Sequence, residues 1–154
     1  MREVNRSSVR SPASFDDAVE ILMVDDRPEN LLALEAVLSS GSGSYRLVGK
    51  MSGEDALRYV MQSDLDKLAL ILMDVHLPGM DGYETAKLMR ERRELRQVPI
   101  IFITAAYKSK SNVRQGYLTG SIDYLFKPLD PDILRWKVDN FVHLHRSQRE
   151  LKQM

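Results

Sequence analysis

Two apolar runs of the chain end on acidic residues, and these acids are the first candidates for chemistry. The run LALILM is followed by Asp74, and the run VEILMV is followed by the adjacent pair Asp25 and Asp26. Apolar runs of this length bounded by turn residues predict buried strands. Ligands of an open α/β sheet bind where such strands open into loops, so the three carboxylates are predicted to lie at one edge.

Two further apolar runs end on groups that could assist those acids. VPIIFI is followed by Thr104, and IDYLF is followed by Lys127. Three carboxylates in one cleft repel one another unless a cation lies among them, and a set of oxygen ligands favours Mg²⁺. With that metal bound, Asp74 could act as a nucleophile toward a phosphoryl group, while Lys127 and Thr104 contact its other oxygens.

Each of these residues also has an ordinary structural explanation. Asp74 could cap a loop, and Asp25 or Asp26 could cap the helix that follows them. Thr104 could be a plain β-branched strand end, and Lys127 could be a solvated surface lysine. Their coincidence at one edge favours a site, because unrelated surface residues would be scattered over the sheet.

The elements that must position these residues alternate regularly along the chain. Apolar strands are predicted at 19–26, 45–51, 68–74, 98–104 and 122–126, and helices at 28–40, 52–61, 83–92 and 108–119, with a long final helix from 131. Residues 91–97 are interpreted as a solvated helix end and loop. Buried strands that alternate with helices predict an α/β fold with one doubly wound, five-stranded parallel sheet.

Composition narrows the class of protein further. The chain has 154 residues, no cysteine, and 22 basic against 22 acidic residues. The absence of cysteine excludes disulfides and thiolate metal sites, and the balanced charge argues against direct binding of nucleic acid. No apolar run approaches the roughly 18 residues that span a bilayer, and the polar residues 1–18 are interpreted as a disordered leader. A cytoplasmic location is therefore expected.

Four motifs carry a resemblance to a known family. ILMVDDRPEN, ILMDVHLPGMDGYE, IIFITA and GSIDYLFKPLD together resemble a response-regulator receiver domain of two-component signalling, over about residues 19–146. The resemblance implies a flavodoxin-like strand order of 2-1-3-4-5, with five helices of which the last is extended. It also implies a cis peptide bond between Lys127 and Pro128.

The same resemblance implies a role for each site residue. Asp74 would accept the phosphoryl group, and Thr104 and Lys127 would contact it. Mg²⁺ would bind to four ligands, namely Asp25, Asp26, Asp74 and the backbone carbonyl of His76. Thr104 and Tyr124 would form the switch that remodels the surface of the fourth helix, fifth strand and fifth helix, although Tyr124 could also be plain core. The ring of His76 is interpreted as solvent-facing, with an influence on phosphoryl lifetime as the alternative.

The implied partner is a sensor histidine kinase or a phosphotransfer protein. Residues 147–154 are interpreted as a helical tail, with three explanations open: a linker to an output domain outside this chain, a dimerising helix, or a frayed end. A Mg²⁺-dependent phosphohydrolase is a rival, because such enzymes also use an Asp nucleophile. They usually carry a second Asp two residues after it, however, where this chain has His76. A module that binds partners without taking phosphate is the second rival.

Overall fold

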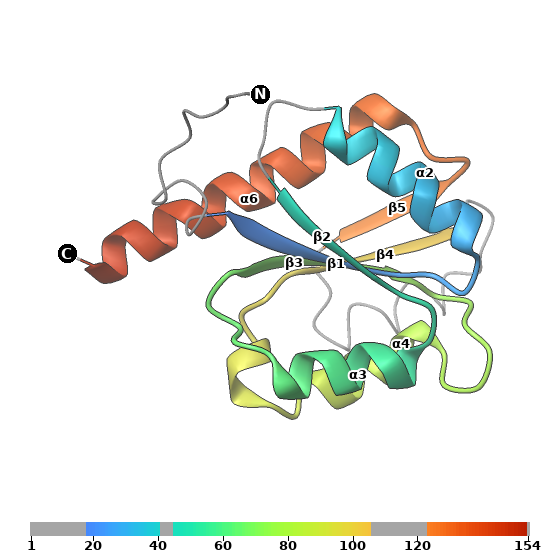
Figure 1. Cartoon of the computed structure of the whole chain (residues 1–154), viewed down its shortest axis with the longest axis horizontal. Coiled ribbons are helices and arrows are strands. Elements are labelled where there is room, and N and C mark those ends of the chain that lie inside the picture. Colours follow the sequence, from blue (N-terminus) through green and yellow to red (C-terminus); the bar gives the residue numbers. More distant parts are fainter. Residues whose placement is uncertain (1–17, 41–44, 106–122, 154) are drawn as a thin grey trace, which may run out of the picture.

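Five parallel strands form one sheet in the order β2-β1-β3-β4-β5 (Figure 1). The computed structural model describes residues 18–40, 45–105 and 123–153. The strands are β1 (Val19–Val24), β2 (Tyr45–Lys50), β3 (Leu68–Asp74), β4 (Ile100–Ala105) and β5 (Asp123–Lys127). The predicted α/β fold and strand order are confirmed.

Helices cover both faces of this sheet, with α2 and α6 on one face and α3 and α4 on the other (Figure 1). They are α2 (Pro28–Ser39), α3 (Gly53–Gln62), α4 (Gly82–Met89) and α6 (Pro131–Gln153), with a 3₁₀ helix η1 (Arg93–Leu95). The predicted helix at 108–119 and leader residues 1–17 lie outside the described residues. Among the helices that are described, none has the length and apolar character that crossing a membrane requires.

The strands separate two cores because successive side chains point to opposite faces of a sheet. On β1, Leu22 and Val24 pack toward α3 and α4, whereas Ile21 and Met23 pack toward α2 and α6. Every residue of β1 and β3 is buried. These two central strands therefore fix the edge on which their acids lie.

Side chains cap three of the helices. Ser52 accepts a hydrogen bond from the backbone N–H of Asp55 at 3.0 Å, and Asp130 accepts one from the backbone N–H of Asp132 at 2.8 Å. Helix α4 has a full capping box between Asp81 and Glu84, which the sequence analysis missed. The start of α4 is thereby held firmly at the end of the loop that follows β3.

Residues 91–97 are mostly exposed, as their charges suggest, but they include the 3₁₀ helix η1 and one buried side chain. Leu95 is fully buried, at 0% exposed. The guanidinium of Arg90 donates to the carbonyls of Leu95 and, at 2.7 Å, Val98, while that of Arg92 donates to the carbonyl of Val60. Leu95 therefore packs into the core, while its charged neighbours stay exposed and two nearby arginines donate to backbone carbonyls.

We expect Leu95→Ala to lower the free energy of unfolding by about 2–5 kcal/mol, because it leaves a cavity in a closed core. Leu88→Ala is the matched control, since Leu88 lies on α4 and is 39% exposed. It should cost less than about 1 kcal/mol. Urea unfolding followed by circular dichroism measures both, and equal costs would contradict the packing described for η1.

Candidate functional site

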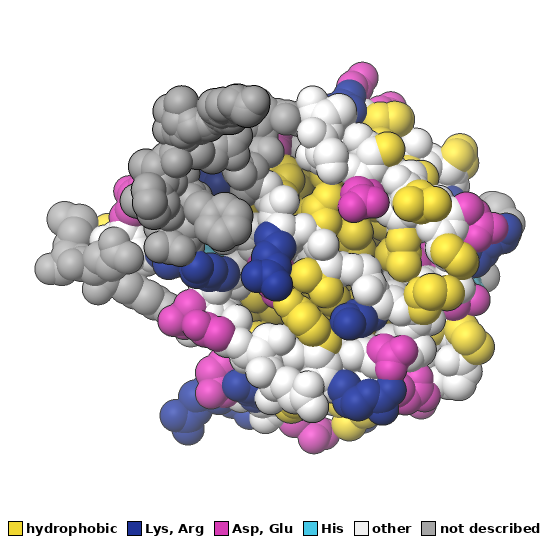
Figure 2. All heavy atoms as spheres, viewed as in Figure 1, with side chains coloured by type: hydrophobic (Ala, Val, Ile, Leu, Met, Phe, Trp, Pro, Cys, Tyr) yellow, Lys and Arg dark blue, Asp and Glu magenta, His cyan; other side chains and the backbone are white. Residues whose placement is uncertain are grey.

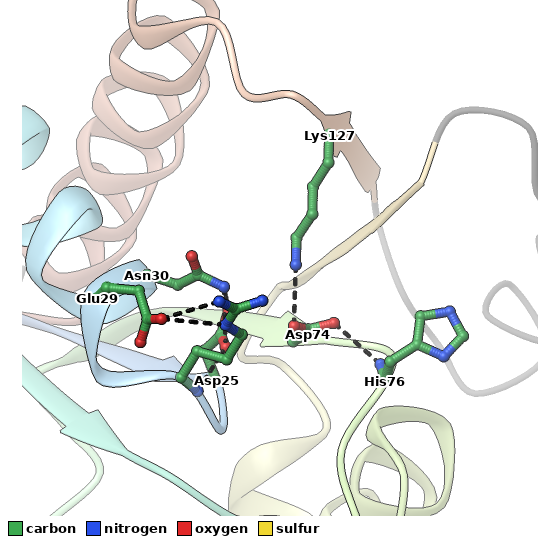
Figure 3. A network of polar contacts seen from close by, with 7 residues as sticks. Asp25, Glu29, Asn30, Asp74, His76 and Lys127 are labelled. Atoms are coloured by element: carbon green, nitrogen blue, oxygen red, sulfur yellow. Dashed lines mark hydrogen bonds and ion pairs between the residues drawn. The ribbon is translucent and has the colours of Figure 1, made fainter.

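The carboxyl ends of four strands bring the predicted residues to one edge of the sheet, where Figure 3 shows Asp25, Asp74 and Lys127. Asp25 directly follows β1, and Asp74 is the last residue of β3. Thr104 and Lys127 stand at the ends of β4 and β5, where Thr104 pairs with Phe126 in the register. The scattered segments of the sequence thus meet as predicted.

Asp25, Asp26 and Asp74 form a cluster that could hold a metal ion. Each offers a carboxylate oxygen, and these oxygens lie within 4.8 Å of one another. Asp25 is 2% exposed and Asp74 is 3% exposed. Buried acids this close repel each other, so a cation among them would be strongly favoured.

Asp25 is fixed by neighbours on α2. Its carboxylate accepts a hydrogen bond from the backbone N–H of Arg27 at 3.0 Å and from the Asn30 amide at 3.1 and 3.2 Å. The N-cap of α2 is Arg27, so neither Asp25 nor Asp26 is the helix cap considered above. Asn30 was missed by the sequence analysis, although it lies one turn into a helix that starts beside the acids.

The electrostatics of Asp25 reflect its burial. Desolvation raises the pKa of this carboxyl above its ordinary value, and the negative charge of Asp74 adds to the rise. The N–H of Arg27, the charge of Lys127 and the amide of Asn30 offset part of this rise. The donors and the positive charge around Asp25 therefore do not fully offset its burial and its repulsion by Asp74.

Asp74 has a partner on each carboxylate oxygen. Oδ1 accepts the backbone N–H of His76 at 2.9 Å, and Oδ2 pairs with Lys127 Nζ at 3.1 Å (Figure 3). The Lys127 side chain is 39% exposed and reaches inward to an acid whose side chain is 4% exposed. The interpretation of Lys127 as merely solvated is therefore wrong.

Thr104 presents a hydroxyl that is buried without a partner. The residue is 2% exposed, and within residues 18–40, 45–105 and 123–153 its Oγ1 makes no hydrogen bond. A buried hydroxyl in that state is costly, and it is ready to donate to an oxygen brought to this edge. This finding favours a role in the site over a plain strand end.

The loop between β3 and α4 lies directly against the backbone of Asp74. A Cβ at Gly82 would lie 2.2 Å from the Asp74 carbonyl oxygen, so only glycine fits there. The N–H of Gly82 donates to the Val75 carbonyl at 2.9 Å, and Gly79 has a φ of 73°, which favours glycine. Two glycines thus allow α4 to start in contact with the acid.

The remaining predicted positions have clear places. The His76 side chain is exposed, in keeping with the solvent-facing interpretation. Tyr124 is buried, and its hydroxyl shares a hydrogen bond of 2.9 Å with that of Tyr83. The Lys127–Pro128 peptide bond is cis, which confirms that expectation.

A cavity of about 370 Å³ adjoins this edge between α2 and the start of α6. Asp25 and Lys127 line its polar end, and apolar side chains such as Leu34 and Leu134 line the rest. Figure 2 shows hydrophobic side chains gathered on the face where α2 lies in Figure 1. The acids are thus flanked by an apolar hollow.

Comparison with known proteins gives consistent matches. The family model of the response regulator receiver domain matches residues 21–139. Response regulator Rre1 of Synechocystis sp. is 32% identical over 126 residues, which cover 82% of this chain and 52% of Rre1. The cyclic di-GMP phosphodiesterase response regulator RpfG of Xanthomonas campestris is 32% identical over 139 residues, covering 90% of this chain and 35% of RpfG.

Solved structures agree with these matches. The receiver domain of a signal transduction histidine kinase from Syntrophus aciditrophicus has a TM-score of 0.72 and 27% identity, covering 82% of this chain and 91% of that one. The chemotaxis protein CheY4 of Vibrio cholerae also reaches 0.72, at 23% identity, covering 80% of this chain and 98% of CheY4. At that identity the likeness shows the fold alone. The chain spans only about a third to a half of the two curated relatives.

We expect Mg²⁺ to raise the melting temperature of the protein, because an ion bound among the acids stabilises only the folded state. At ten times its dissociation constant the ion adds about 1.4 kcal/mol. Asp25→Asn should lose most of this rise, while it leaves the metal-free protein no less stable because one like charge is removed. Glu35→Gln is the control, since Glu35 is an exposed acid on α2. An unchanged Mg²⁺ response in Asp25→Asn would argue against the cluster as the site.

Proposed function

The chain belongs to the family of response regulator receiver domains, and we propose that Asp74 is the residue on which it takes a phosphoryl group. As a member of that family it is a receiver of two-component signalling. The observation that carries the proposal is the setting of Asp74: a buried carboxylate with a lysine on one oxygen, a backbone N–H on the other, and two further acids within 4.8 Å.

The donor is a phosphohistidine of a sensor histidine kinase or a phosphotransfer protein. A carboxylate oxygen of Asp74 forms a bond to phosphorus while the bond between phosphorus and the donor nitrogen breaks, and that nitrogen keeps the electron pair. The N–H of His76 and the ammonium of Lys127 hold the carboxylate in one orientation before the donor arrives. The nucleophilic carboxylate is therefore oriented before the donor arrives.

The residues of the acid cluster fit a resident Mg²⁺. Asp25, Asp26, Asp74 and the backbone carbonyl of His76 would hold it, since hard oxygen ligands suit this ion. When bound, Mg²⁺ neutralises charge on the phosphoryl oxygens. Asn30 and the N–H of Arg27 keep Asp25 in its ligating position.

Thr104 and Lys127 would contact the phosphoryl group once it is on Asp74. The phosphoryl group adds a charge of about −1.5 to −2 and three acceptor oxygens. The Thr104 hydroxyl, which lacks a partner among the described residues, gains one by donating to such an oxygen. Movement of Thr104 then vacates space into which Tyr124 turns, so the phosphoryl group favours the packing with Tyr124 buried and thereby changes the surface of β5 and α6, as a population shift between two packings.

We extend the proposal to the surroundings of the domain. The receiver unit comprises residues 19–146, and the rest of α6 connects it to a partner or an output domain outside this chain or pairs in a homodimer. The chemistry of the domain is limited to its own phosphorylation and dephosphorylation. We also propose that the protein is cytoplasmic and that it does not bind nucleic acid or membrane directly.

Asp74→Asn should abolish incorporation of phosphate from acetyl phosphate in the presence of Mg²⁺, because an amide oxygen is a poor nucleophile. Intact-protein mass spectrometry detects the gain of one phosphoryl group. Asp64→Asn is the control, since Asp64 is an exposed acid outside the site. Phosphate still attached at position 74 of the variant would refute the assignment, and no incorporation by the unmodified protein would favour a module that binds without phosphate.

Thr104→Val should keep or raise the free energy of unfolding, by up to about 1 kcal/mol, because it removes a buried hydroxyl that lacks a partner. It should also remove most of the conformational response to beryllofluoride, a phosphoryl mimic. Amide hydrogen exchange across β5 and α6 measures that response. Thr104→Ser keeps the hydroxyl and should retain it, whereas an undiminished response in Thr104→Val would exclude this role.

A further inference from the structure

The hydroxyl of Tyr124 is held inside the protein by a second tyrosine. Tyr124 on β5 is 6% exposed and Tyr83 on α4 is 3% exposed. Their hydroxyl oxygens lie 2.9 Å apart in a buried hydrogen bond that joins segments 41 residues apart in the chain. Two buried hydroxyls that satisfy each other stabilise one orientation of both side chains, because turning either one outward leaves the other without that partner.

Aromatic packing reinforces this pair. Phe102 on β4 contacts the Tyr83 ring edge to face, with centroids 4.7 Å apart, and lies 5.7 Å from the Tyr124 ring. Phe126 stacks on Tyr124 at 5.9 Å. The four rings therefore form one cluster on the face of the sheet that α3 and α4 cover, and the hydroxyl pair is a polar contact within it.

Tyr83 also lies next to a residue that packs against the backbone of Asp74. It follows Gly82, whose Cα packs so near the Asp74 carbonyl oxygen that a Cβ there would lie 2.2 Å from it. The capping box of Asp81 and Glu84 fixes the same turn of α4. A shift of the Asp74 backbone would therefore meet Gly82, the residue next to Tyr83.

We propose that the Tyr83 hydroxyl is a positioning group that keeps Tyr124 in its buried orientation and thereby favours the packing that accompanies a phosphoryl group on Asp74. The second half of this inference rests on the proposed function; the first half does not. Thermodynamic linkage is reciprocal. A contact that stabilises the buried orientation of Tyr124 increases the affinity for any ligand that prefers that orientation, and such a ligand in turn stabilises the buried orientation. Loss of the Tyr83 hydroxyl should therefore make burial of Tyr124 depend more strongly on the phosphoryl group.

The test is the rate at which tetranitromethane nitrates Tyr124, localised by peptide mass spectrometry. Tyr83→Phe keeps the ring and its contact with Phe102 and removes only the hydroxyl. Loss of one net hydrogen bond predicts that Tyr124 nitration becomes about two- to tenfold faster than in the unmodified protein. Beryllofluoride with Mg²⁺ should restore most of the protection of Tyr124 in the variant without a matching change at Tyr59, whereas general stabilisation of a loosened fold would protect both tyrosines.

Two controls accompany this measurement. Tyr45→Phe removes a hydroxyl bonded to Asp139, away from the cluster, and should leave Tyr124 nitration unchanged. Tyr59 on α3 is the internal reference, and its rate should be the same in the unmodified protein and in Tyr83→Phe. A parallel rise at Tyr59 would mean general loosening and would overturn the positioning role.

The outcomes separate this inference from the proposed function. An unchanged Tyr124 rate in Tyr83→Phe overturns the inference, whatever Asp74 does. A faster rate that beryllofluoride fails to restore, although the mimic gives a bound ¹⁹F signal in the variant, overturns the coupling. Absence of a bound ¹⁹F signal in the unmodified protein counts against the proposed function and therefore against the coupling. In that case, the rate of Tyr124 nitration without beryllofluoride still decides whether Tyr83 holds Tyr124.

Discussion

Repulsion among three carboxylates at one edge of the sheet is the constraint on which the rest of the site depends. Asp25 and Asp74 are almost wholly buried, and burial raises the pKa of Asp25. The fold compensates with fixed donors: the N–H groups of Arg27 and His76, the Asn30 amide and the Lys127 ammonium. These donors come from the start of α2, the loop after β3 and the end of β5, so the compensation of the charge depends on the fold that brings these elements together.

Much of the fold was predictable from the sequence because its strongest signals are local. The apolar runs that end on Asp25 and Asp74 identify buried strands, and Asp130-Pro131 marks the start of α6. Contacts between distant segments were not predictable in this way. Neither Asn30 nor Tyr83 belongs to a local pattern that reveals its partner, since only the folded chain brings Asn30 to Asp25 and Tyr83 to Tyr124.

The errors of the sequence analysis have a common physical cause, which is that helical periodicity and charge describe a segment without its neighbours. Helical spacing places Met61 on the same face of α3 as Leu57, and yet Met61 is 48% exposed and lies next to the helix end at Gln62. Leu95 lies among charged residues and is fully buried, because Arg90 and Arg92 donate to backbone carbonyls around it. The resemblance to a family implied the role of each site residue, whereas only the folded structure showed which residues hydrogen-bond to it.

Helix α6 is longer than the part of it that packs on the sheet. Its buried contacts at Leu134, Val138 and Val142 lie in the first half of the helix, which begins four residues after Lys127 and projects past the start of β1 (Figure 1). A helix of 23 residues is about 34 Å long, so about 16 Å of it extends beyond its last buried contact at Val142. A tilt of the whole helix by about 5° would displace this free part by about 1 Å more than the part that packs on the sheet.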